Sequence, residues 1–89
     1  MSLEAYRKEI DAIDTEMREL FIKRMEVATK IGLYKKERNL PIFQPGREAE
    51  LIEKRSEGGP EELKVYYKEF LQDVMNISKE RQAEVTEIE

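Results

Sequence analysis

The chain has 89 residues, 40% of them charged, with a net charge of −4 and a pI near 5.1. This acidic balance argues against nucleic acid or an anionic membrane as a partner. Because the chain contains no Cys and no His, disulfides, thiol catalysis and imidazole general bases are excluded. Charges interrupt every apolar stretch, so neither a secretory signal nor a membrane span is predicted. We expect one domain, residues 1–89, in the cytoplasm.

The first predicted element is a long helix, residues 3–38. Its apolar positions recur in alternating steps of three and four, which is typical of a helix packed lengthwise on another. Asn39, which tolerates left-handed backbone, and Pro41 end it. Gly32 indicates either a close approach of backbone or ligand, or a tolerated defect. The positions of this first-helix seam are Leu3, Tyr6, Ile10, Ile13, Met17, Leu20, Arg24, Val27, Ile31 and Tyr34.

Two more helices and no strand are predicted, so the fold class is all-α, with a long, a short and a long helix. Pro45 suits the first turn of the short helix, about residues 46–56, with Gln44 at the capping position. The run Gly58-Gly59-Pro60 separates it from the third helix. The predicted apolar stripe of that helix is Leu63, Tyr67, Phe70, Val74 and Ile77, flanked by Leu71, Met75 and Val85.

The length of the first helix predicts a homodimer. Residues 3–38 span about 54 Å at 1.5 Å per residue, whereas a compact chain of this size has a diameter near 30 Å. A monomer would leave much of the apolar seam exposed, which is unfavourable. We therefore expect two intertwined chains that pair their first helices antiparallel.

Arg24 occupies a seam position where a Leu is expected. A buried guanidinium needs a carboxylate, supplied either by a structural salt bridge or by a ligand. Lys35 lies about 16 Å farther along nearly the same face, which leaves room for a ligand the size of a sugar ring. Arg7 is about 42 Å from Lys35 within one chain, so only the partner's Arg7 could complete a site there.

Four further polar residues, Arg47, Glu48, Ser78 and Gln82, extend this constellation. Together the residues describe a pocket with several cations, neutral hydrogen-bonding groups and one carboxylate. No nucleophile–base pair and no metal cluster is present in the pattern, so no cofactor or metal is expected. Such a pocket suits a compact dianion whose reaction depends on positioning and charge stabilisation.

Four segments resemble the all-helical chorismate mutase family: Tyr6–Asp14, Lys23–Arg24, Ile31–Lys36 and Pro41–Glu48. The resemblance extends over about residues 3–85. It implies rearrangement of chorismate to prephenate, in which the enzyme holds the folded conformer and stabilises negative charge on the breaking ether oxygen.

The resemblance also implies roles for individual residues. Lys35 and Gln82 would donate to the ether oxygen, and Arg24 with the partner's Arg7 would bind the two carboxylates. Ser78 would contact a carboxylate, Glu48 would accept the ring hydroxyl, and Arg47 would support it. Gln44 and Gly46 depart from the family pattern, which has an Asp and a helix former there, and both loosen the start of the second helix.

Two other functions remain compatible with the sequence. A lyase that removes pyruvate from isochorismate makes similar demands on its pocket. A regulatory helical dimer could retain the pocket without catalysis, although it would not need Ser78 or Gln82. The chain could also be fused to, or dock with, another enzyme of aromatic biosynthesis.

Overall fold

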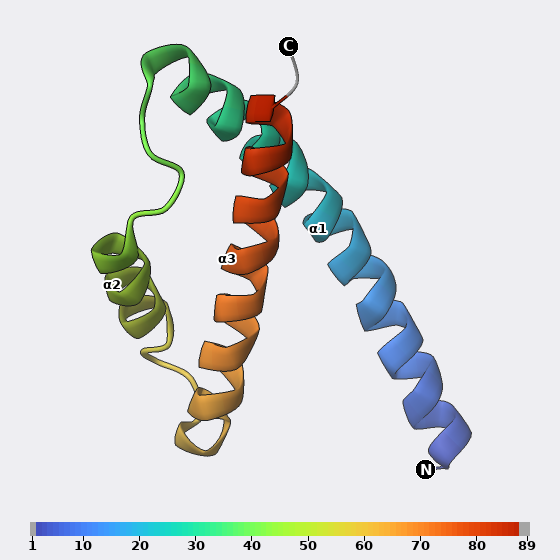
Figure 1. Ribbon diagram of the computed structural model, residues 1–89. Coiled ribbons are helices and arrows are strands. Elements are labelled where there is room, and N and C mark those ends of the chain that lie inside the picture. The colour runs from blue at the N-terminus through green and yellow to red at the C-terminus, as the bar shows by residue number, and fades with distance from the viewer. Residues whose placement is uncertain (1, 88–89) are drawn as a thin grey trace.

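The computed structural model describes residues 2–87. It contains the helices α1 (Leu3–Arg38), α2 (Pro45–Arg55) and α3 (Lys64–Glu87), with a short 3-10 turn, η1 (Glu61–Leu63), before α3 (Figure 1). No strand occurs within the described residues, so the predicted all-α class and helix order are confirmed. In the same range, no helix combines the length and the apolar character needed to cross a membrane.

Local capping chemistry fixes both ends of α1. The Ser2 hydroxyl accepts a hydrogen bond from the Ala5 amide at 3.1 Å, which is the usual N-cap contact. At the other end Asn39 adopts a left-handed conformation, with φ of 56°, and the Leu40 amide bonds back to the Lys35 carbonyl at 2.9 Å. The predicted end at Asn39 is therefore confirmed.

The second helix begins at Pro45, one residue before the predicted start, and ends at Arg55. Gln44 holds the capping position as expected, but its side chain makes no capping hydrogen bond. The end of α2 is better fixed, because buried Ser56 donates its hydroxyl to the Ile52 carbonyl at 2.6 Å. A 2.7 Å ion pair from Lys68 to Glu53 also ties α2 to α3.

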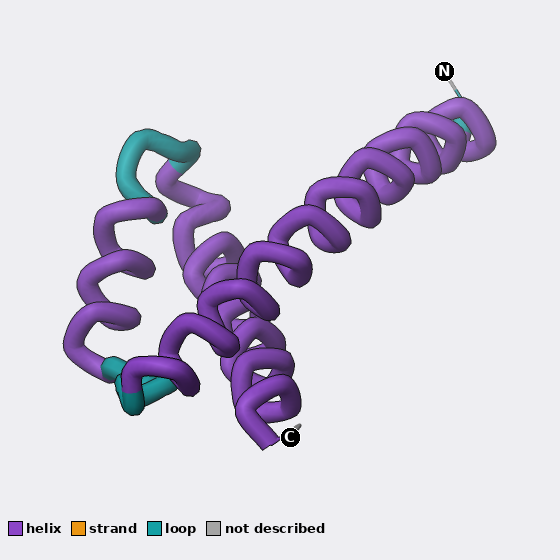
Figure 2. The backbone as a smooth tube through the Cα atoms, turned by 90° about the horizontal axis from the view of Figure 1, so that it is seen from above, coloured by secondary structure: helices purple, strands orange, loops and turns teal. Residues whose placement is uncertain are grey.

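The three helices form an extended molecule. α3 contacts both α2 and the C-terminal half of α1, whereas the N-terminal half of α1 runs away from the other helices (Figures 1 and 2). The molecule measures 54 × 28 × 14 Å, and its radius of gyration is 16.3 Å. A compact chain of this length would have a radius of gyration of about 12 Å, so half of α1 lacks cover from its own chain.

The buried core is small and lies where α1 crosses α3. Its buried apolar residues are Ala28 of α1 and Leu71, Met75 and Val85 of α3. A Cβ on Gly32 would lie 2.7 Å from a Val85 methyl carbon, so of the two alternatives for this glycine the close approach is the correct one, and the approaching group is α3.

The predicted apolar stripe of α3 is not the row of residues that is buried within the chain. Leu63, Tyr67, Phe70 and Ile77 are each at least 40% exposed, as are all the apolar members of the first-helix seam. The buried row is the flank that also carries Ser78 and Gln82. The sequence locates the apolar positions of α3, but it does not indicate which of them are buried against helices of their own chain.

Candidate active site

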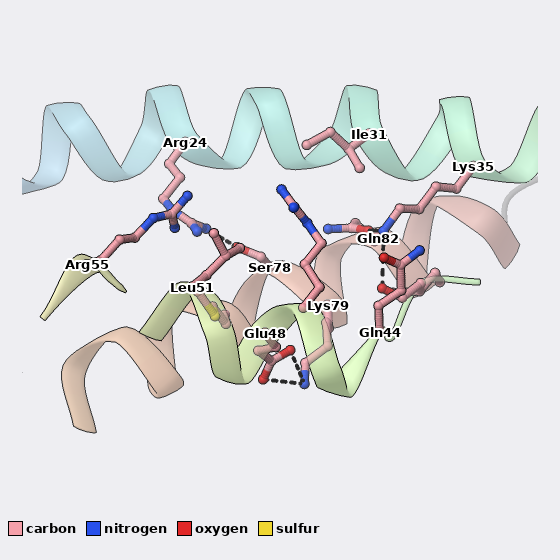
Figure 3. A pocket seen from close by; sticks show the side chains of 13 residues that line it. Arg24, Ile31, Lys35, Gln44, Glu48, Leu51, Arg55, Ser78, Lys79 and Gln82 are labelled. Carbon is pink, nitrogen blue, oxygen red and sulfur yellow. Dashed lines mark hydrogen bonds and ion pairs between the residues drawn. The ribbon is translucent and has the colours of Figure 1, made fainter. Parts of the chain in front are cut away.

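A cavity of about 360 Å³ lies between the C-terminal half of α1, α2 and α3 (Figure 3). Seven of the eight predicted site residues line it: Arg24, Lys35, Gln44, Arg47, Glu48, Ser78 and Gln82. They come from all three helices and the connector before α2, so the fold brings together residues that are far apart in the sequence.

Arg7 is the predicted residue that does not line the cavity. It lies on the part of α1 that extends away from α2 and α3 (Figure 1). Arg7 precedes Arg24 by about 25 Å along the helix, which exceeds the reach of its side chain. A single chain therefore cannot bring Arg7 to this cavity.

Arg24 is positioned at one end of the cavity by Ser78. The guanidinium donates to the Ser78 hydroxyl oxygen, and that hydroxyl donates to the Val74 carbonyl at 3.0 Å. Because the hydroxyl proton is engaged by α3 itself, Ser78 here holds Arg24 rather than presenting a donor to the cavity. Partial burial lowers the pKa of Arg24, and the positive charge of Arg55 lowers it further.

Lys35 and Gln82 form a donor pair at the other end of the cavity (Figure 3). The Lys35 ammonium donates to the Gln82 side-chain oxygen at 3.3 Å and to the Ile42 carbonyl at 3.2 Å. An ammonium has three protons, so one remains. Because the side-chain oxygen of buried Gln82 accepts this bond from Lys35, the Gln82 NH₂ group remains able to donate to another group.

Glu48 supplies the one carboxylate among the described residues that line the cavity. It pairs with the Lys79 ammonium at 3.1 Å and accepts from the Gln72 amide at 2.6 Å. Lys79 also lies over the Phe43 ring, 4.0 Å from its centre. The negative charge of Glu48 is thus already matched, and its oxygens are held by two side chains of α3.

Sequence reasoning missed two cations of the cavity, Arg55 and Lys79. Helical spacing could have found both of them. Arg55 follows Glu48 by seven residues, and Lys79 precedes Gln82 by three, so each shares a face with a predicted residue. The cavity is therefore lined by five cations and one carboxylate, in a chain whose net charge is −4.

No group of acidic, His or Cys side chains that could hold a metal ion occurs within residues 2–87. The donors that line the cavity are instead ammonium, guanidinium and amide groups. These groups bind anions through charge-assisted hydrogen bonds.

The sequence model of the family described as "Chorismate mutase type II" matches residues 6–83. The chain belongs to this family. The match runs from before Arg7 to beyond Gln82 and so includes every predicted site residue. The resemblance found in the sequence is confirmed.

Several curated relatives match parts of the chain. The T-protein of Haemophilus influenzae is 39% identical over 54 residues, and that of Enterobacter agglomerans is 38% identical over 53 residues. The "Bifunctional chorismate mutase/prephenate dehydratase" of Aquifex aeolicus is 48% identical over 52 residues. These matches cover 58–61% of the chain but only 14% of each relative, so the chain aligns with a small part of each one. No solved structure matches significantly.

Proposed function

We propose that the chain is a chorismate mutase, an isomerase that converts chorismate to prephenate. The observation that carries this proposal is a cavity with five cations, one paired carboxylate and the Lys35–Gln82 donor pair. Chorismate carries two carboxylates and a breakable ether bond, which such a cavity matches in charge and hydrogen bonding. The cavity volume also falls within the range of small-molecule sites.

The rearrangement is intramolecular: the ether C–O bond breaks as a C–C bond forms, and no proton or group leaves the molecule. Arg24, held by Ser78, binds one carboxylate. The remaining proton of Lys35 and the amide protons of Gln82 meet the ether oxygen, where negative charge develops. Because Gln82 is buried and already bonded to Lys35, these donors are in place before the reaction and need little reorganisation.

We propose a homodimer in which antiparallel first helices cover each other and the partner's Arg7 enters the cavity. The exposed first-helix seam and the distance of Arg7 from the cavity of its own chain support this arrangement. Sedimentation should give a dimer at micromolar concentration, and a folded monomer would contradict the proposal. Mixing inactive Arg7→Ala and Lys35→Ala chains should restore activity, since one site of the mixed dimer would keep both cations.

The test of the activity is the rate of chorismate loss and prephenate formation by the wild type and by Arg24→Ala. Two charge-assisted hydrogen bonds to a carboxylate contribute about 1.5–3 kcal/mol each. Arg24→Ala should therefore lower kcat/KM by roughly 10²- to 10⁴-fold. Release of pyruvate from isochorismate without prephenate formation would favour the lyase, and no turnover of either substrate would favour a regulatory dimer.

We also propose that this domain works together with a second enzyme. The Aquifex aeolicus relative is named as a bifunctional enzyme of which the aligned part is a small share. We expect this domain to work joined to, or docked with, another enzyme of aromatic biosynthesis in the cytoplasm. Co-purification with a prephenate-consuming enzyme from cell extracts at native expression would support this proposal. Purification without such an enzyme would contradict it.

A further inference from the structure

We propose that Arg55 is a further substrate-binding residue, which shares one carboxylate of the substrate with Arg24. This inference rests on the proposed function, because it assigns a contact within the same cavity. The two guanidiniums come from different helices of one chain, Arg24 from α1 and Arg55 from α2. A carboxylate at this end would then be held from two sides before any residue of a second subunit takes part.

The geometry of the two side chains supports this assignment. Arg55 extends from the end of α2 into the cavity and toward Arg24 (Figure 3). The two guanidinium charges also interact, since the positive charge of Arg55 lowers the pKa of Arg24. Like charges at short range repel, so an empty cavity disfavours this arrangement and a bound anion favours it.

Neither guanidinium has a carboxylate partner within the described residues. Several other cations do: Lys68 pairs with Glu53, Lys79 with Glu48, and Arg81 with Glu84. Arg24 bonds only the neutral hydroxyl of Ser78 among the side chains described. The Arg24–Arg55 pair is therefore a site of uncompensated positive charge at the solvent-exposed edge of the cavity. The planar fork of a guanidinium matches the two oxygens of a carboxylate, which is the anionic group of the proposed substrate.

The backbone that carries Arg55 is well fixed. The next residue, Ser56, is buried and bonds back to Ile52, and the Glu53–Lys68 ion pair ties the same turn to α3. The cavity end is thus built from α1, α2 and α3 together. We expect substrate binding to strengthen the docking of α2.

A simpler role for Arg55 is stabilisation of the negative end of the α2 dipole, where cations are favourable. Lys54 separates the two roles, because it lies in the same last turn but does not line the cavity. Lys54→Leu removes the same charge from the same helix end, so it is the matched control for Arg55→Leu. Arg55→Lys keeps the charge but loses the two-pronged donor geometry.

The first measurement is steady-state kinetics with chorismate. Arg55→Leu should raise KM at least about tenfold, the effect of losing one charge-assisted hydrogen bond. Arg55→Lys should lie between Arg55→Leu and the wild type, and Lys54→Leu should match the wild type. Equal kinetics for Arg55→Leu and Lys54→Leu would overturn the proposal. A lower melting temperature or weaker dimer for Arg55→Leu with unchanged KM would also overturn it, by showing a structural role.

The second measurement does not depend on turnover and uses malonate as the probe. Malonate should raise the melting temperature of the wild type and of Lys54→Leu above that in chloride of equal ionic strength. The increase should be several-fold smaller for Arg55→Leu. An equal increase in all three proteins, or no increase in the wild type, would overturn the anion site. If wild type fails to convert chorismate but malonate gives the expected pattern, the proposed activity fails and the Arg24–Arg55 site stands.

Discussion

The substitution Gln82→Glu tests whether the Lys35–Gln82 pair acts on the reacting oxygen. The wild-type amide donates at any pH, and the chain contains no His. We therefore expect a flat rate from about pH 5 to 8. In Gln82→Glu, one carboxylate oxygen would take the Lys35 proton now donated at 3.3 Å. The other would replace the NH₂ group, so an acceptor would face the developing negative charge.

The size of the effect follows from the number of donors lost. Removing one preorganised donor from an oxyanion site lowers kcat by about 10²- to 10³-fold. Lys35 retains one proton for the ether oxygen because Ile42 and Gln82 use the other two. We therefore expect at least a 10²-fold loss at neutral pH, not a complete loss.

The loss should be reversed by acid. The introduced carboxyl starts from a reference pKa of about 4.3, which burial raises and Lys35 lowers. Once protonated it can donate, so the rate of chorismate loss should rise as pH falls and approach the wild-type rate. Asn76→Asp makes the same amide-to-acid change on the exposed surface of α3 and should keep a flat profile. If Gln82→Glu has the wild-type rate and the same flat profile, Gln82 does not contact the reacting oxygen.

Three further predictions concern stability. Arg24→Ala should leave the melting temperature unchanged or raise it, because it removes a cation without a carboxylate partner among residues 2–87; a large drop would show a structural role. Gly32→Ala should lower the melting temperature by roughly 4–8 °C, because overpacking against α3 costs about 1–3 kcal/mol and outweighs the gain in helix propensity of about 1 kcal/mol. The matched variant Gly46→Ala meets no atom within 4 Å and should raise the melting temperature. Thermal melts of the two glycine variants with the same sign would contradict this contrast. The hydrogen bond and charge of Lys68 lower the pKa of Glu53, so their stabilisation is complete above the usual Glu range and is lost as pH falls below it; Glu53→Gln and wild-type melting temperatures should converge in acid.

The parts of the fold that depend on local chemistry could be predicted from the sequence. Asn39 ends α1 as expected because capping needs only neighbouring residues, and Ser2 caps the start of α1 in the same local way. A close approach at Gly32 was one of two alternatives, because a small residue in a helix permits it, but the sequence did not identify α3 as the approaching group. The buried row of α3 could not be predicted, since Leu71 and Phe70 are both large apolar residues and only the docking of α3 decides that Leu71 is buried and Phe70 is exposed.

The cavity was predictable to a similar degree. A seam position occupied by Arg24 and a motif spread over the chain located seven lining residues. Arg55 was missed because its shared face with Glu48 was overlooked in a chain with 40% charged residues. The direction in which the Arg55 side chain points depends on how α2 docks on α3. The bond from Ser78 to Val74 was missed because it depends on a side-chain rotamer.

Stability and activity place opposite demands on the first-helix seam. Four buried apolar residues form the core of the described chain, so much of the folding free energy in the proposed dimer must come from pairing the seam. A Leu at position 24 would contribute roughly 1.5–3 kcal/mol of burial to that pairing. Arg24 instead brings a guanidinium into the cavity and leaves its charge without a carboxylate partner in the described chain. The dianion that neutralises this charge should therefore stabilise the folded dimer by mass action, so assembly and substrate binding reinforce each other at the same residue.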